Sequence, residues 1–196
     1  MSNNVNKNHL RIRALTEGAI MLALGIVLNY LSKLLFVNMP QGGSVTLGMF
    51  PVLFYAHRWG VGKGLLMGFA YGLLDMLIDG GYAWGWQSIL LDYLVAYTAL
   101  GLGGLFRGKS WGVFPDVAVG CLARFAVHYV SGITLYRILV PTAVEGLEHL
   151  GAFDNPHLYS LVYNGVYMLP NTVINLVIAG LLFVPLRKYF SGSDIR

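Results

Sequence analysis

The apolar residues of this 196-residue chain come in long runs that few charged residues interrupt. Hydrophobic residues make up 56% of the sequence and charged residues 11%, and the mean hydropathy is +0.62. A water-soluble domain of this length carries about 25% charged residues, so this chain has too few to cover a surface that faces water. We therefore expect lipid to surround most of it.

A membrane-crossing helix needs about 20 mostly apolar residues. Six segments approach that requirement: Ala14–Val37, Val45–His57, Gly64–Ile78, Trp86–Phe106, Trp111–Leu139 and Leu158–Pro185. The second and third are short, so they extend into neighbouring turns or lie inside the bundle. We expect an all-α, polytopic six-helix bundle that forms one domain, with residues 1–13 before it, about 14–186 within it and 187–196 after it. The first run is longer than the core of a signal peptide, and we interpret it as a retained helix.

The basic residues lie mainly in the gaps between the apolar runs. Lys and Arg collect on the cytosolic side of membrane proteins. With a cytosolic N-terminus, ten of the 13 bases fall on the inner side: Lys7, Arg11, Arg13, Arg58, Lys63, Arg107, Lys109, Arg187, Lys188 and Arg196. Lys33 and Arg137 then fall outside, and Arg124 falls within a span. This distribution predicts that both termini are cytosolic. The outer segments are then Asn38–Ser44, Asp79–Gly85 and Tyr136–His157.

Several classes of function find no support in the sequence. The bases separate membrane spans instead of forming a patch, so the net charge of +4 does not indicate nucleic-acid binding. Cys121 is the single cysteine, which excludes an internal disulfide and a cysteine-based metal site. The sequence contains no phosphate-binding glycine loop, zinc-protease motif or serine-hydrolase motif, so we expect no ATP hydrolysis by this chain. We expect His57, His149 and His157 to be solvated.

Polar and aromatic residues recur at helical spacing within the expected spans. An ionisable residue inside a bilayer costs about 2.5–3.5 kcal/mol and usually faces the protein interior. Residues four apart share one face of a helix. This spacing forms stripes on four helices, all in the outer half of the membrane: Tyr71, Asp75 and Asp79; Asp92 and Tyr93; Arg124, His128, Gly132 and Tyr136; Tyr159, Tyr163 and Tyr167, with Asn164 adjacent.

Several uncharged residues in or near this cluster have simpler interpretations when each is taken alone. Trp84, Trp86 and Tyr136 fit aromatic anchors at the membrane interface. Asn171 and Asn175 lie deeper and fit hydrogen bonds that join helices.

The charged members also have alternatives. Arg124 can pair with Asp92 merely to reduce the cost of burial. Asp75 and Asp79 are close enough to the outer boundary to form a solvated helix end. The cluster as a whole is harder to explain in this way than any single member, and we interpret it as a pocket.

A pocket of this composition suits a small, flat, cationic molecule that enters from outside. Aromatic rings stack on flat heterocycles and attract cations through their faces. A buried carboxylate favours a cationic ligand or an amidine-like pair of donors.

Five segments in order along the chain carry a resemblance to a known family: Met39–Ser44, Leu91–Ala96, Gly101–Arg107, His128–Gly132 and Tyr159–Gly165. They resemble the thiamin transporters, which are the substrate-binding (S) components of energy-coupling factor (ECF) transporters. The resemblance runs from residue 14 to about residue 185. It implies a six-helix bundle in the bacterial plasma membrane. Thiamin, the transported ligand, would bind near the outer side, capped by the loop after the first helix.

The resemblance also implies a set of pocket residues. Asp92 takes the place of the family's acidic residue before a tyrosine, here Tyr93. His128 matches the family's histidine, and Tyr136 stands where some members have a tryptophan. The other implied substrate-binding residues are Gly132, Tyr159, Asn164, Tyr71, Tyr82 and Arg124.

The implied partners are a transmembrane coupling subunit and two cytosolic ATPases, with no cofactor and no metal. Ala19 and Ala23 have a spacing that lets another helix approach closely, although packing within the bundle fits it equally well. The leading hypothesis is non-enzymatic capture of thiamin. The alternatives are a secondary transporter for another small flat cation, and an intramembrane enzyme that uses Asp75 with Asp92, or His128 as a base.

Overall fold

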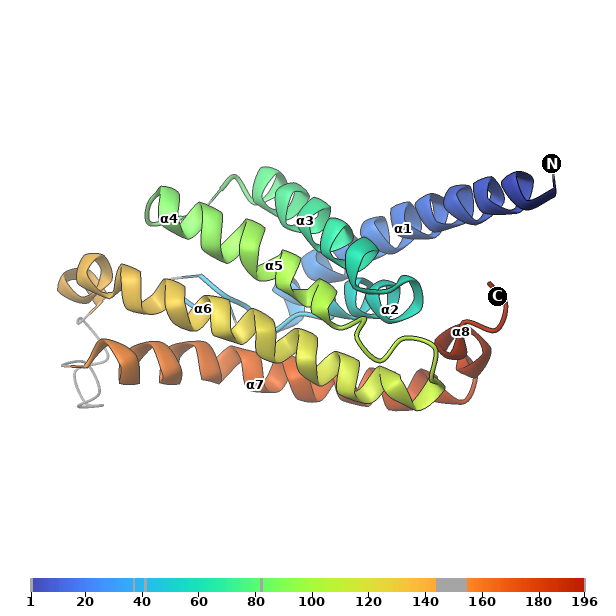
Figure 1. The fold of residues 1–196 in the computed structure, drawn as a ribbon. Helices are drawn as coiled ribbons and strands as arrows, with labels where there is room; N and C mark the ends of the chain where they lie inside the picture. The colour runs from blue at the N-terminus through green and yellow to red at the C-terminus, as the bar shows by residue number, and fades with distance from the viewer. Residues whose placement is uncertain (1, 37, 41, 82, 144–154, 196) are drawn as a thin grey trace.

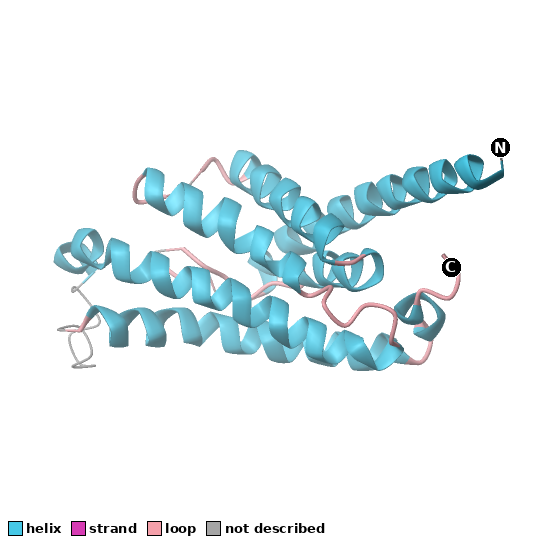
Figure 2. Cartoon of the chain, viewed as in Figure 1, coloured by secondary structure: helices cyan, strands magenta, loops and turns pink. Residues whose placement is uncertain are grey.

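The structure is a computed structural model that describes residues 2–36, 38–40, 42–81, 83–143 and 155–195. Figure 1 shows an elongated helical bundle with both chain ends at the same end of the molecule. Its elements are α1 (Ser2–Leu35), α2 (Met49–Trp59), α3 (Val61–Ile78), α4 (Trp86–Ser88), the π-helix η1 (Ile89–Val95), α5 (Ala96–Ala99), the 3₁₀-helices η2 (Leu100–Leu102) and η3 (Ser110–Gly112), α6 (Val113–Ala143), α7 (Pro156–Phe183) and α8 (Arg187–Ser191). Figure 2 shows only helices and loops in the described part, which confirms the all-α prediction there.

Within the part of the chain that the structure describes, four helical segments are long and apolar enough to cross a membrane: Lys7–Leu35, Val61–Ile78, Ser110–Tyr136 and Pro156–Phe183. They expose large apolar side chains, such as Leu34 at 83% and Leu181 at 74%, which in water would be unfavourable. Lipid solvates such side chains without cost, so the chain is a multi-pass membrane protein.

The second expected span, 45–57, corresponds to α2, which begins at residue 49. All 11 residues of α2 are buried, so α2 lies inside the bundle. A central helix does not need the length of a lipid-facing one, since other helices surround it. The fourth expected span, 86–106, corresponds to the run from α4 through η1 and α5 to η2, which ends at residue 102.

Two glycines of α3 bring this run into backbone contact with α3. A Cβ atom at Gly68 would collide with the carbonyl oxygen of Tyr97, and one at Gly72 with that of Tyr93. The close approach places Asp75, one turn beyond Gly72, beside the side chain of Tyr97.

His57, near the C-terminal end of α2, was predicted to be solvated, and this prediction is wrong. It is fully buried, with Nδ1 2.6 Å from Asp116 Oδ2 and Nε2 2.9 Å from the carbonyl oxygen of Phe190. The short helix α8 turns back under α2 and covers it with Phe190, which is itself fully buried. The apolar pattern does not predict α8, so the burial of His57 was missed. His149 lies outside the described residues, and His157 is exposed as predicted.

A charge network at the same end ties the C-terminal segment to α1 and α2. Arg58 donates to both carboxylate oxygens of Asp194, at 2.8 and 2.7 Å, and to Glu17 at 2.6 Å. Arg13 also contacts both Asp194 and Glu17. The hydrogen bonds from Arg58 lower the pKa of Asp194 to about 2. The ion pair therefore stays formed at any pH well above that value.

Candidate functional site

A cavity of about 390 Å³ lies between α1, α3, η1, α5, α6 and α7. Figure 1 shows these elements meeting in the part of the bundle away from the chain ends. The cavity is lined by Lys33, Asn38, Met39, Pro40, Gly42, Gly43, Ser44, Asp75, Asp79, Ser88, Asp92, Tyr93, Tyr97, Arg124, His128, Ser131, Gly132, Leu135, Tyr159, Tyr163, Asn164 and Tyr167. Residues from each of the four predicted stripes thus line one space, although Tyr71 and Tyr136 are not among them.

Asp92 is held by three side-chain hydrogen bonds. Its carboxylate accepts from the hydroxyl groups of Ser88 at 2.8 Å and Ser131 at 2.9 Å, and lies 3.0 Å from Nδ1 of His128. Asp92 belongs to the π-helix η1, a wider turn that is frequent at functional sites. The side chain keeps 27% of its surface exposed, so the carboxylate is oriented and still accessible from the cavity.

Arg124 and His128 continue this chain of contacts on α6. Arg124 Nε donates to His128 Nε2 at 3.1 Å, and a guanidinium group has no acceptor. Nε2 of His128 is therefore the acceptor, which leaves Nδ1–H to donate to Asp92. Arg124 is thus linked to Asp92 through His128. The direct ion pair between Arg124 and Asp92, considered above as a way to reduce the cost of burial, is not formed.

One terminal nitrogen of the Arg124 guanidinium is available to a ligand. Its Cζ lies 3.9 Å from the ring centroid of Tyr97, and the residue is only 6% exposed. Among the described residues Nη1 is buried without a hydrogen-bond partner. A buried donor of this kind is costly unless something accepts from it, so Arg124 can serve a ligand at the cavity wall.

Three tyrosines of α7, four residues apart, form an aromatic wall. The rings of Tyr159 and Tyr163 stack with centroids 5.7 Å apart, and Tyr167 meets Tyr163 edge to face at 6.3 Å. Tyr167 also meets His128 edge to face at 5.8 Å, which joins the wall to α6. The wall offers flat faces to a flat ligand.

Asn164 and Gly132 fasten α6 to α7. The Asn164 amide donates to the backbone oxygen of His128 at 3.1 Å and accepts from the Tyr167 hydroxyl at 2.7 Å. A Cβ atom at Gly132 would collide with the Ser160 side chain. Both residues line the cavity while they set the spacing of its walls.

Asp75 lies at the bottom of the cavity and is not a solvated helix end. It is only 3% exposed and accepts hydrogen bonds from Asn29 at 2.7 Å and the Tyr97 hydroxyl at 2.8 Å. Of the two interpretations considered for Asp75, the pocket therefore fits and the solvated helix end does not, because partners from α1 and α5 cover the carboxylate. Asp79 does lie at the rim, where Lys33 donates to it at 2.6 Å.

Several polar groups at the site were not predicted from the sequence: Asn29, Lys33, Ser88, Tyr97 and Ser131. Asn29 and Lys33 are four apart within a mostly apolar stretch, a signal of the kind that identified the other stripes. Ser88 and Ser131 are small residues that sequence alone does not distinguish from packing serines.

Two of the residues implied by the resemblance do not line the cavity. Tyr71 is fully buried below it, with its ring 4.7 Å from that of Tyr97. Tyr136 lies outside the lining and meets Tyr159 edge to face at 5.5 Å. Tyr82 is outside the described residues. Tyr71 and Tyr136 therefore support lining residues from behind.

The remaining sequence-based expectations concern the surface and the helix contacts. Trp86 is 70% exposed, as an interfacial anchor would be. Asn171 binds the backbone of the α1–α2 connection, and Asn175 binds the backbone of its own helix, instead of joining two helices. Ala19 and Ala23 lie on an exposed face of α1.

The charges of the lining leave an excess of one negative charge. Asp75, Asp79 and Asp92 face two bases, Lys33 and Arg124, and His128 is neutral in the tautomer that its contacts require. Among the described residues no group of three His, Cys, Asp or Glu side chains could hold a metal ion.

An oriented carboxylate, an aromatic wall and a spare guanidinium donor around a cavity of this size make a small-molecule site, which typically measures about 300–1,000 Å³. Within a multi-pass helical bundle, such a site is characteristic of proteins that bind or transport a solute.

The chain belongs to the thiamine transporter protein (Thia_YuaJ) family, whose model matches residues 15–191. It is 34% identical over 183 residues to the thiamine transporter ThiT of Bacillus subtilis (strain 168), covering 87% of this chain and 90% of that protein. It is 26% identical over 204 residues to ThiT of Lacticaseibacillus paracasei, covering 96% and 95%. A solved structure of ThiT from Listeria monocytogenes has the same fold, with a TM-score of 0.76 at 22% identity over 92% of this chain and 98% of that one. The family resemblance and the prediction of a non-enzymatic transport role are thereby confirmed.

Proposed function

We propose that this chain captures thiamin from the outer side of the bacterial plasma membrane as the S component of an ECF importer. The observation that carries the proposal is the match between the cavity and a flat monocation, in a chain of the thiamine transporter family. Thiamin joins a permanently cationic thiazolium ring to a flat aminopyrimidine. The excess negative charge of the lining balances one such cation, and the aromatic wall matches its flat rings.

Asp92 is the centre of the proposed binding mode. Its carboxylate attracts the thiazolium, while His128 orients it. The rings of Tyr159 and Tyr163 stack on the ligand, and the spare Nη1 donor of Arg124 binds the oxygen of the hydroxyethyl group. The other predicted residues complete the site: Tyr93, Gly132 and Asn164 at the walls, and Tyr71 and Tyr136 around them. Tyr82, outside the described residues, is kept in the proposal from the family resemblance alone.

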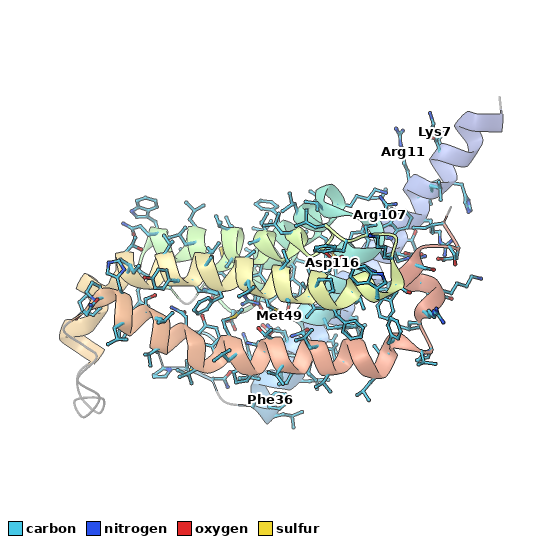
Figure 3. The ribbon with its side chains drawn as sticks, turned by 60° about the horizontal axis from the view of Figure 1, so that its bottom comes forward. Lys7, Arg11, Phe36, Met49, Arg107 and Asp116 are labelled. Carbon is cyan, nitrogen blue, oxygen red and sulfur yellow. The ribbon has the colours of Figure 1, made fainter. Side chains whose placement is uncertain are left out.

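The proposed orientation has six membrane-embedded helical segments and both termini in the cytosol. The four long helices cross the membrane, and α2 and the α4–η2 run fill the bundle between them. Figure 3 shows Lys7, Arg11 and Arg107 at the end that carries the chain termini, which supports a cytosolic position for that end. The cavity then lies towards the outer side.

The proposed partners are an ECF transmembrane coupling subunit and two cytosolic ATPases. Binding by itself supplies no net work, so accumulation of thiamin needs an energy source on another chain. Ala19 and Ala23 are exposed on α1, where small side chains allow a partner helix to approach closely.

The first test is a titration of the purified chain with thiamin, followed by tryptophan fluorescence. We expect a saturable change at one thiamin per chain. Riboflavin, a flat but uncharged vitamin, is the control and should give no saturable change. Absence of a thiamin response, or an equal response to both, would refute the assignment.

A second test separates the S component from a secondary transporter. The chain is placed in proteoliposomes alone, or together with a coupling subunit and ATPases, and uptake of radiolabelled thiamin is measured. We expect accumulation only with the partners and ATP. Accumulation by the chain alone, driven by an ion gradient, would favour the secondary transporter.

A further inference from the structure

Residues 42–48, here called the cover segment, connect the cavity wall to the start of α2. Gly42, Gly43 and Ser44 line the cavity, whereas Thr46 is buried at 1% exposure below it. The segment thus has an outer half that faces the ligand space and an inner half within the bundle.

The side chain of Asn171 in α7 holds the inner half through its backbone. Asn171 Oδ1 accepts from the Thr46 backbone N–H at 2.7 Å, and Nδ2 donates to the Ser44 carbonyl oxygen at 2.9 Å. One amide therefore satisfies a donor and an acceptor two residues apart, as a neighbouring strand would. Asn171 is 1% exposed, so water cannot replace these bonds without opening the bundle.

Two residues of α1 hold the same half from the other side. Asn29 accepts from the Thr46 hydroxyl at 2.8 Å, and Ser32 accepts from the Leu47 N–H at 2.9 Å. Asn29 also donates to Asp75 at the cavity bottom, so the inner half shares one hydrogen-bond network with the site.

The outer half forms a tight turn in which Gly42 N–H donates to the Met39 carbonyl oxygen at 3.1 Å and the Gly43 carbonyl oxygen accepts from Met39 N–H at 2.9 Å. Gly42 and Gly43 have φ angles of +96° and +92°, which glycine adopts without strain. A Cβ atom at Gly43 would lie 2.6 Å from the Tyr167 ring, so the segment rests directly on the aromatic wall. The Tyr163 hydroxyl donates to the Gly42 carbonyl oxygen at 2.9 Å, next to the ligand space.

We propose that Asn171 is a positioning residue for ligand retention, through its hold on the inner half of the cover segment. It does not touch the cavity. It fixes Ser44 and Thr46 so that Gly42 and Gly43 close over the ligand, and release requires the outer half to swing away. The inference rests on the proposed capture of thiamin.

Asn175 provides a matched control one turn along the same helix. It is also an asparagine and fully buried, but its amide donates to the Asn171 backbone oxygen within α7 and not to the cover segment. Asn171→Leu and Asn175→Leu therefore remove the same chemistry from the same helix, and only the first releases the segment.

The experiment measures dissociation of radiolabelled thiamin from each purified variant after addition of excess unlabelled thiamin, and association by stopped-flow fluorescence. Asn171→Leu loses two hydrogen bonds, and we expect about 30-fold faster dissociation, equivalent to about 2 kcal/mol, with little change in association. Asn175→Leu should dissociate within about threefold of the wild-type rate. Equal dissociation rates for the two variants would overturn the inference.

Hydrogen exchange on the wild-type chain gives a second test that depends on no variant. At residue resolution, we expect the Thr46 and Leu47 amides to stay protected with or without thiamin, and the Gly43 amide to exchange faster without it. Equal loss of protection at all three amides on removal of thiamin would contradict a fixed inner half. If the wild-type chain binds no thiamin, the proposed function fails, whereas protection of Thr46 still reports on the hold by Asn171.

Discussion

Replacing Asp92 by asparagine removes the negative charge of the side chain and keeps its size and shape. The amide oxygen of the introduced side chain can still accept from His128, and its NH₂ group can donate to Ser88 or Ser131, so the local packing is retained. The change makes the cavity lining neutral overall, since the five charged residues otherwise leave one excess negative charge.

The dimensions of the cavity set the expected size of the effect. A sphere of 390 Å³ has a radius of about 4.5 Å, which leaves room for a cation to pack against the Asp92 carboxylate at about 5 Å. At an effective dielectric constant of about 20, that interaction amounts to about 3 kcal/mol. Asp92→Asn should therefore weaken thiamin binding about 100-fold.

The assay is isothermal titration calorimetry in detergent, with thiamin and with a neutral analogue in which carbon replaces the charged ring nitrogen. The neutral analogue should lose less than about threefold in affinity on Asp92→Asn, because it gains nothing from the carboxylate. Equal losses for both ligands would assign Asp92 a structural role. Unchanged thiamin affinity would refute the electrostatic reasoning altogether.

Three further predictions concern the scaffold. His57→Leu leaves Asp116 buried without its histidine and should lower the unfolding free energy by about 3 kcal/mol in thermal denaturation, with the thiamin affinity unchanged since neither residue lines the cavity. Asp194→Asn should destabilise the chain at pH 7. Because the folded pKa of Asp194 is depressed from 3.8 to about 2 by Arg58, the difference in melting temperature should shrink as the pH falls from about 4 to about 2. Gly68→Ala should cost about 2 kcal/mol in the same denaturation assay, because its Cβ meets a carbonyl oxygen of α5, and unchanged stability would mean that α3 and α5 are not in backbone contact.

Helical periodicity predicted much of the site because it is a property of the backbone. Arg124, His128 and Gly132 line the cavity, and so do Tyr159 and Tyr163, as their four-residue spacing requires. The face of a helix on which a residue lies follows from the backbone geometry alone and does not depend on the neighbouring helices.

The same periodicity explains why Tyr136 falls outside. With 3.6 residues per turn, each step of four residues turns about 40° beyond a full rotation. Tyr136 is three steps from Arg124, so it points about 120° away from the start of the stripe. The drift left His128 and Gly132 at the cavity and carried Tyr136 behind the wall.

The burial of Asp75 and His57 depends on contacts with residues far away in the sequence, which sequence patterns do not predict. Asp75 looks like a helix end in water, but Asn29 and Tyr97, which are 46 and 22 residues away, cover it. His57 is buried by Phe190, 133 residues further along the chain. No local pattern contains such contacts, so a residue near a predicted membrane boundary can be solvated or buried.

The central claim is that thiamin occupies the cavity beside Asp92, and a structure determined with thiamin bound tests it most directly. We predict that the thiazolium ring lies within the cavity against the Asp92 carboxylate, with the flat rings on the faces of Tyr159 and Tyr163. Thiamin bound elsewhere on the chain, with this cavity empty, would contradict the account.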